Sequence, residues 1–105
     1  MEQLIKTGRY QGEQAVLIDA EVSTHTSDWL RVSQFKDATI QIEIEDTATV
    51  VLEGRIITDG TQLIELGTYT VSEAITVDIR FLELRGRITS WTAGEVTVNY
   101  LGYKG

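Results

Sequence analysis

The residues that could carry out catalysis in this chain are few. It has one histidine, His25, and no cysteine, which excludes thiolate nucleophiles and histidine-rich metal sites. A serine–histidine–aspartate triad would have to use His25, which lies in STHTSD, residues 23–28, three positions before Asp28. This composition is typical of an exposed loop, and the sequence has no nucleophile elbow or HExxH motif. We therefore predict a protein that is not an enzyme, with no catalytic residue and no cofactor.

The densest group of carboxylates is EIED, residues 43–46. Glu43 and Glu45 would share one face of a strand, and such oxygen ligands can hold calcium. The spacing of an EF-hand loop is absent, however, and Ile44 between them fits a core position. We therefore expect a solvated outer face here and no metal site.

Length and charge narrow the class of protein. The 105 residues predict one domain, and sixteen acidic against nine basic residues give a formal net charge of -7. Nucleic acid and anionic membranes are not expected partners, because both attract lysine and arginine. The acidity is explained by solubility or by contact with a basic patch on a protein partner. The segment MEQLIK does not resemble a signal peptide, and no apolar run approaches the roughly 20 residues of a membrane span, so we expect a cytosolic protein without export.

Alternation of apolar and polar residues predicts an all-β chain. The cleanest strand is ATIQIEIE, residues 38–45, and the longest regular stretch is RFLELRGRITSWTAGEVTVNYLG, residues 80–102. The second reads as a hairpin that turns at Thr92, Ala93 and Gly94. About eight strands are expected in all. The side chains predicted to point inward are Val16, Ile18, Val22, Leu30, Val32, Ile40, Ile42, Ile44, Val50, Leu52, Ile56, Ile75, Val77, Ile79, Leu82, Leu84, Ile88, Val96, Val98 and Tyr100.

Glycines supply the local signals between and within these strands. Asp59 and Gly60 predict a hairpin with a type I′ turn, because both tolerate positive φ. Gly54 and Gly86 fall inside strand patterns, which indicates a bulge or a close approach of another group to the backbone.

Two sheets packed face to face would bury all of these apolar stripes. We therefore predict a single-domain antiparallel β-sandwich, jelly-roll or immunoglobulin-like in its connections, with a small closed barrel as the alternative. Residues 1–12 show no clear period and are interpreted as an N-terminal arm or lead-in strand, and residues 13–105 as the sandwich domain. Deleting the arm is expected to leave thermal unfolding nearly unchanged and to weaken partner binding.

The outer faces of the strands are where partners would bind. Arg85 and Arg87 lie on the face of residues 80–102 opposite the aliphatic stripe, which is either solvated or a docking surface. Replacing both with glutamate is expected to change folding little and to reduce association if the face docks. The aromatic residues opposite the aliphatic stripes, at the sandwich corners or in an exposed cluster, are Trp29, Phe35, Phe81 and Trp91. The candidate interface residues are Arg85, Arg87, Trp29, Trp91, Arg31 and Tyr103, with Arg55 among the same outward arginines.

Three segments together carry a family resemblance: DWLRVSQFKDATIQIEI, TATVVLEGRIITDGT and YTVSEAITVDIRFLELRGRITSWTAGEVTVNYL. Over residues 28–101 they are similar to small β-sandwich structural proteins of tailed bacteriophages. The resemblance implies a virion component, chiefly a capsid decoration (cement) protein that binds the major capsid protein, often as a homotrimer. A neck, tail or fibre protein is the alternative. A carbohydrate-binding module that uses Trp29, Trp91 and the tyrosines is a hypothesis of a different class.

Overall fold

The computed structural model describes residues 12–104, and every strand pairing in this range is antiparallel. The strands are β1 (Gly12–Glu21), β2 (His25–Thr26), β3 (Leu30–Arg31), β4 (Asp37–Ile44), β5 (Thr47–Arg55), β6 (Ile64–Tyr69), β7 (Glu73–Asp78), β8 (Glu83–Ala93) and β9 (Val96–Tyr103). None of the described residues belongs to a helix that could cross a membrane. The predicted arm, residues 1–12, lies outside the described residues except for Gly12, which pairs with Tyr103 as the first residue of β1.

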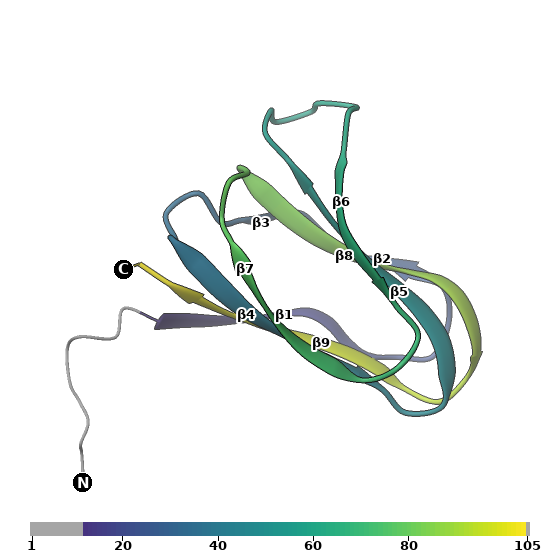
Figure 1. The fold of residues 1–105 in the computed structure, drawn as a ribbon. Coiled ribbons are helices and arrows are strands. Elements are labelled where there is room, and N and C mark those ends of the chain that lie inside the picture. Colours follow the sequence, from purple (N-terminus) through teal and green to yellow (C-terminus); the bar gives the residue numbers. More distant parts are fainter. Residues whose placement is uncertain (1–11, 105) are drawn as a thin grey trace, which may run out of the picture.

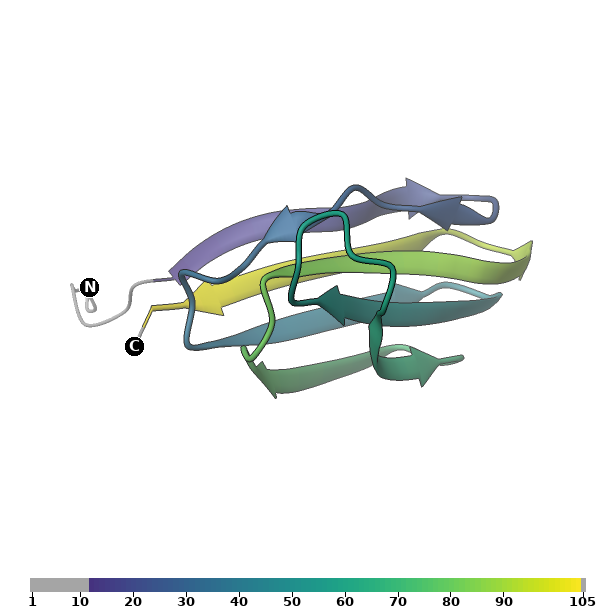
Figure 2. The same ribbon diagram turned by 90° about the horizontal axis from the view of Figure 1, so that it is seen from above.

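The strands form two sheets that face each other, as Figures 1 and 2 show from two directions. Sheet A has the order β1-β9-β4-β7, and sheet B has the order β2-β8-β5-β6 with β3 also paired to β8. Side chains from both sheets form one buried cluster between them. The predicted antiparallel β-sandwich is therefore confirmed, with the short β2 and β3 as separate strands.

The connection between β8 and β9 differs from the prediction. Residues 80–102 do contain two strands joined at Gly94, whose φ of 87° allows the turn. However, β8 lies in sheet B and β9 in sheet A, so the segment is an arch across the sandwich and not a hairpin. The apolar stripes of the two strands face each other across the core. Among the described strands, only β5 and β6 are consecutive in the chain and also paired along their length.

Most of the predicted core residues are buried, and the exceptions have a local cause. Val16 and Val22 are 56% and 54% exposed, because β1 shifts register on either side of Ile18 and buries Leu17 beside it. Ile56 is 62% exposed because β5 ends one residue earlier, at Arg55. Five other predicted core residues are only half-buried: Leu30, Ile75, Val77, Ile79 and Leu82.

The aromatic residues divide between the core and its margin. Phe35 and Phe81 are buried, and the ring of Phe35 meets that of Tyr100 edge-on at 5.7 Å between centroids. Trp91 packs against the edge of the core, and its indole Nε1 donates a hydrogen bond to the Gly94 carbonyl oxygen at 2.7 Å. Four aromatic residues were predicted to lie opposite the aliphatic stripes. Three of them therefore lie in the core or pack against it.

The glycines inside strands mark close approaches, as predicted. A Cβ on Gly54 would lie 2.9 Å from the Phe81 ring, and one on Gly86 would lie 3.2 Å from the Ile18 side chain. The hairpin after β5 is also confirmed, but its type I′ turn at Asp59 and Gly60 is wrong. The Gly60 amide donates to the Ile57 carbonyl oxygen, so Asp59, with a φ of 66°, is the third residue of the turn.

One strained residue in β1 gives a stability prediction. Ala20 has a φ of 51°, which costs a residue with a Cβ about 1–2 kcal/mol. Ala20→Gly removes that strain and adds a smaller entropy to the unfolded chain, so we expect a gain of about 0.5–1 kcal/mol in chemical unfolding. Ala74→Gly, at an exposed site in β7 with ordinary φ, is the control and should lose stability. Equal losses in both variants would show that Ala20 is not strained.

The Tyr100 hydroxyl gives a pH prediction. It is buried without a hydrogen-bond partner among the described residues. Burial raises the pKa of this phenol well above its usual value near 10, and the carboxylates of Glu13 and Asp37 raise it further.

Because the folded state holds this proton more tightly than the unfolded state, its contribution to stability is complete below pH 10 and is lost as the pH rises above it. We expect Tyr100→Phe to be somewhat more stable than the parent protein at pH 7, because it removes a buried hydroxyl without a partner, and we expect this difference to grow as the pH rises above 10, as measured by urea denaturation across that range. If the stability of the variant fell as steeply above pH 10 as that of the parent protein, groups other than Tyr100 would cause the loss of stability.

Candidate protein-interaction face

The residues considered for a catalytic triad, His25, Ser27 and Asp28, line one pocket, but within residues 12–104 no hydrogen bond or ion pair joins the imidazole of His25 to either of the other two. His25 lies in β2, and its Nδ1 is 3.9 Å from Glu21 Oε1, with both side chains partly exposed. Within residues 12–104, no three histidine, cysteine, aspartate or glutamate side chains are arranged to hold a metal ion. The densest cluster of interacting charged side chains lies instead on the outer face of sheet B.

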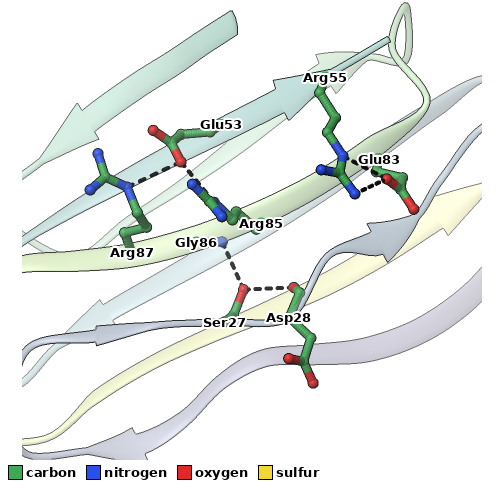
Figure 3. A network of polar contacts seen from close by, with 8 residues as sticks. All are labelled: Ser27, Asp28, Glu53, Arg55, Glu83, Arg85, Gly86 and Arg87. Carbon is green, nitrogen blue, oxygen red and sulfur yellow. Dashed lines mark hydrogen bonds and ion pairs between the residues drawn. The ribbon is translucent and has the colours of Figure 1, made fainter. Parts of the chain in front are cut away.

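Charged residues alternate along β5 and β8 on this outer face. The register places Glu53 opposite Arg85, and Arg55 opposite Glu83. Because side chains two apart on a strand share a face, both pairs point away from the core together. Arg87 follows on β8, on the same face (Figure 3).

These side chains form ion pairs that are largely removed from solvent. Arg55 places Nε and Nη2 each 2.7 Å from Glu83 Oε1, and the two side chains are only 12% and 11% exposed. Arg85 Nε donates to Glu53 Oε1 at 2.9 Å. Arg87 Nε lies 3.1 Å from the same oxygen, close enough for an ion pair but without the alignment of a hydrogen bond (Figure 3).

The segment between β2 and β3 brings a tryptophan to the same arginines. Trp29 has the guanidinium carbons of Arg55 and Arg85 at 4.2 Å and 4.5 Å from its ring centroid. Ser27 holds the segment to β8: its amide donates to the Gly86 carbonyl oxygen, and its hydroxyl accepts from the Gly86 amide at 3.0 Å (Figure 3). The position of Trp29 is thus fixed by backbone pairing on both sides.

We call this cluster the Arg–Trp face. Its residues are Trp29, Arg31, Glu53, Arg55, Glu83, Arg85 and Arg87. The structure brings together four of the six predicted interface residues: Trp29, Arg31, Arg85 and Arg87. Trp91 lies toward the other end of β8, opposite Ala48. Tyr103 is the last residue of β9, in sheet A.

The prediction did not assign Glu53 and Glu83 to specific partners. The signal was present, because LEGR (residues 52–55) and LELR (residues 82–85) both contain Glu-x-Arg. Antiparallel pairing of two such segments sets each glutamate against an arginine.

The burial of these pairs changes what is expected of Arg85 and Arg87. Their side chains are 23% and 35% exposed, and both hold the buried carboxylate of Glu53. Replacing both with glutamate would place three carboxylates together, so we now expect a clear loss of stability and not a neutral change. The double reversal is therefore not a clean test of docking.

Two other surfaces stand out on the described part of the chain. Exposed aliphatic side chains gather around the connection between β5 and β6: Ile56, Ile57, Leu63 and Ile64. A shallow groove where β4, β7 and β9 meet is lined by exposed carboxylates: Glu43, Glu45, Glu73 and Glu95. The Glu95 amide donates to Glu45 Oε1 at 2.8 Å, which ties two of these residues together.

No protein-family model matches the sequence, and no curated protein matches it. The crystal structure of SPBc2 prophage-derived protein YomS has a TM-score of 0.74 at 16% identity, over 96% of this chain and 99% of YomS. The crystal structure of PBSX exported protein XepA has a TM-score of 0.75 at 18% identity, over 93% of this chain and 39% of XepA. This chain thus spans less than half of XepA and nearly all of YomS. At these identities the likeness establishes the fold: this chain is a β-sandwich of the kind found in YomS and in part of XepA.

Proposed function

We propose that this chain is a non-enzymatic structural protein of phage or prophage origin that acts by binding other protein subunits. The observation that carries the proposal is the fold shared with prophage-derived YomS over almost the whole length of both chains. The Arg–Trp face supports it, because arginine and tryptophan are the residues most enriched at the centres of protein interfaces.

Within this class we propose a capsid decoration protein that binds the major capsid protein, as the resemblance to tailed-phage β-sandwich proteins implies. The test is a mass-spectrometric inventory of purified particles, followed by addition of the protein to particles that lack it. Saturable binding in a fixed ratio to the major capsid protein would support the role. Complete absence from purified particles would overturn it.

A second candidate is an exported protein that acts outside the particle. It is favoured by one observation, the match to part of PBSX exported protein XepA. The same inventory separates the two candidates if the culture medium is analysed with the particles. A particle component should sediment with the particles, whereas an exported protein should remain in the supernatant.

The arrangement of the tryptophans argues against the carbohydrate-binding alternative. Trp29 is stacked with Arg55 and Arg85, and Trp91 is held at the other end of β8 by its bond to Gly94. The two indoles therefore do not form one flat platform on which a sugar could stack.

A further inference from the structure

The Arg–Trp face is positive on an otherwise acidic protein. Its four arginines outnumber the three glutamates on the same side of sheet B. These are Glu53, Glu83 and Glu65, which lies on β6 opposite Glu53. The whole chain carries a formal charge of -7, so the remaining surface is strongly negative. On a second copy of the chain, an acidic surface of matching shape would therefore meet opposite charge here, although the two copies as a whole repel each other.

Two arginines of the face have donors to spare. Arg31 is 56% exposed, and its nearest carboxylate oxygen, Glu83 Oε2, is as far as 3.7 Å from its Nε. Arg87 uses only Nε toward Glu53, which leaves its terminal nitrogens without a partner among the described residues. Guanidinium groups of this kind bind carboxylates through paired, charge-assisted hydrogen bonds.

The neighbouring arginines are already ordered. Arg55 and Arg85 are held by buried glutamates and by the ring of Trp29. Because little side-chain freedom remains to be lost, a partner that docks here meets a preorganised surface.

The matching carboxylates lie on the opposite sheet. The groove at the junction of β4, β7 and β9 carries Glu43, Glu45, Glu73 and Glu95, and none of its described lining residues is a lysine or arginine. It lies beyond the Gly94 end of β8, whereas the Arg–Trp face lies at the Glu83 end. We propose that copies of this chain associate head to tail, with the Arg–Trp face of one copy against the acidic groove of the next.

This geometry fixes the type of assembly. The two surfaces lie on different sheets and at different ends of the sandwich, so a single two-fold contact cannot use both at once. A heterologous contact repeats from copy to copy and gives a closed ring or an open filament. The inference goes beyond the proposed function, because it requires only the purified chain and no particle.

Analytical ultracentrifugation of the full-length protein tests the association. At an ionic strength of about 0.1 M, where charges act over only about 10 Å, most of the repulsion between two copies of net charge -7 is screened, and we expect species larger than a dimer as the concentration rises. At about 1 M salt, where screening shortens this distance to about 3 Å, we expect the monomer. A monomer under both conditions would overturn the inference and would leave binding to a capsid untouched.

Charge reversals at exposed positions identify the surfaces. We expect Arg31→Glu, or Glu43→Lys combined with Glu73→Lys, to weaken association at least about tenfold. Arg80→Glu, and Asp78→Lys combined with Asp19→Lys, make the same charge changes at exposed positions outside both surfaces, and should leave association within about twofold. An equal loss in these controls would mean that net charge, and not the proposed contact, drives association.

A mixture of variants distinguishes head-to-tail contact from a two-fold contact. Arg31→Glu keeps a working groove. Glu43→Gln combined with Glu73→Gln, whose neutral groove does not attract the reversed position 31, keeps a working Arg–Trp face. Together they have one compatible contact, so we expect one-to-one dimers and nothing larger. Oligomers of the parent size, or no dimer at all, would overturn the arrangement. Thermal unfolding of Arg31→Glu alongside Arg80→Glu checks that both variants remain folded.

Discussion

Replacing Arg55 with methionine should destabilise the protein by about 3–5 kcal/mol. The substitution keeps an unbranched apolar side chain next to Trp29 but removes the charge that holds Glu83. Glu83 is then a buried carboxylate whose remaining cation is Arg31, at 3.7 Å. Breaking a buried pair by removing one partner costs this much because the other charge remains uncompensated. Urea denaturation of parent and variant measures the difference directly.

The matched control is Arg80→Met, which removes the same chemical group from an exposed pair. Arg80 lies 4.0 Å from Asp78, and both side chains are mostly in solvent, so a cost of about 0–0.5 kcal/mol is expected. Adding Glu83→Met to Arg55→Met should recover much of the loss, since an apolar pair leaves no buried charge. If Arg55→Met cost under about 1 kcal/mol, the pair would have to be solvated in the native state.

Truncating Ile40 to alanine should cost a similar amount for a different reason. Ile40 is fully buried on β4, where it lies between Tyr100 of β9 and Ile75 of β7. Removing buried methyl groups loses their transfer free energy and leaves a cavity, and isoleucine-to-alanine changes in cores cost about 2–5 kcal/mol. We expect about 3–5 kcal/mol, because β4 has paired neighbours on both sides and its backbone has little room to relax.

Ile57→Ala makes the same chemical change outside the core. Ile57 lies in the connection between β5 and β6 and is 64% exposed, so its truncation should stay within about 0.5 kcal/mol. Equal losses at both positions would indicate that the side chains of the β5–β6 connection are covered in solution.

Alternation in the sequence predicts the fold well where strands are regular. Ile40, Ile42 and Ile44 are all buried because β4 keeps its register with β7 and β9. The same rule fails in β1. The register shifts on both sides of Ile18, so residues two apart no longer point to the same face of the sheet. Register shifts depend on the neighbouring strand, so they are not visible in the local sequence.

The Arg–Trp face was predicted in part for a similar reason. Alternation placed Arg85 and Arg87 outward, which is correct, but said nothing about what lies over them. Their environment depends on the pairing of β8 with β5 and on the Ser27–Gly86 contact that brings in Trp29. These are contacts between residues far apart in the chain, and a single sequence does not specify them.

The arch between β8 and β9 has a consequence for how the chain folds. Like most of the described connections, it crosses from one sheet to the other, so consecutive strands pair with distant ones. Apart from the β5–β6 hairpin, neither sheet can begin to form until long loops have closed, and loop closure must be completed before the pairing energy is gained. The time scale of folding is therefore expected to be milliseconds to seconds, as for other β-sandwiches of this size. β4 and β5 lie in the middle of the two sheets in the folded protein, but until folding is complete their edges can pair with other chains. The nascent protein is therefore most prone to aggregation before its last strand, β9, is in place.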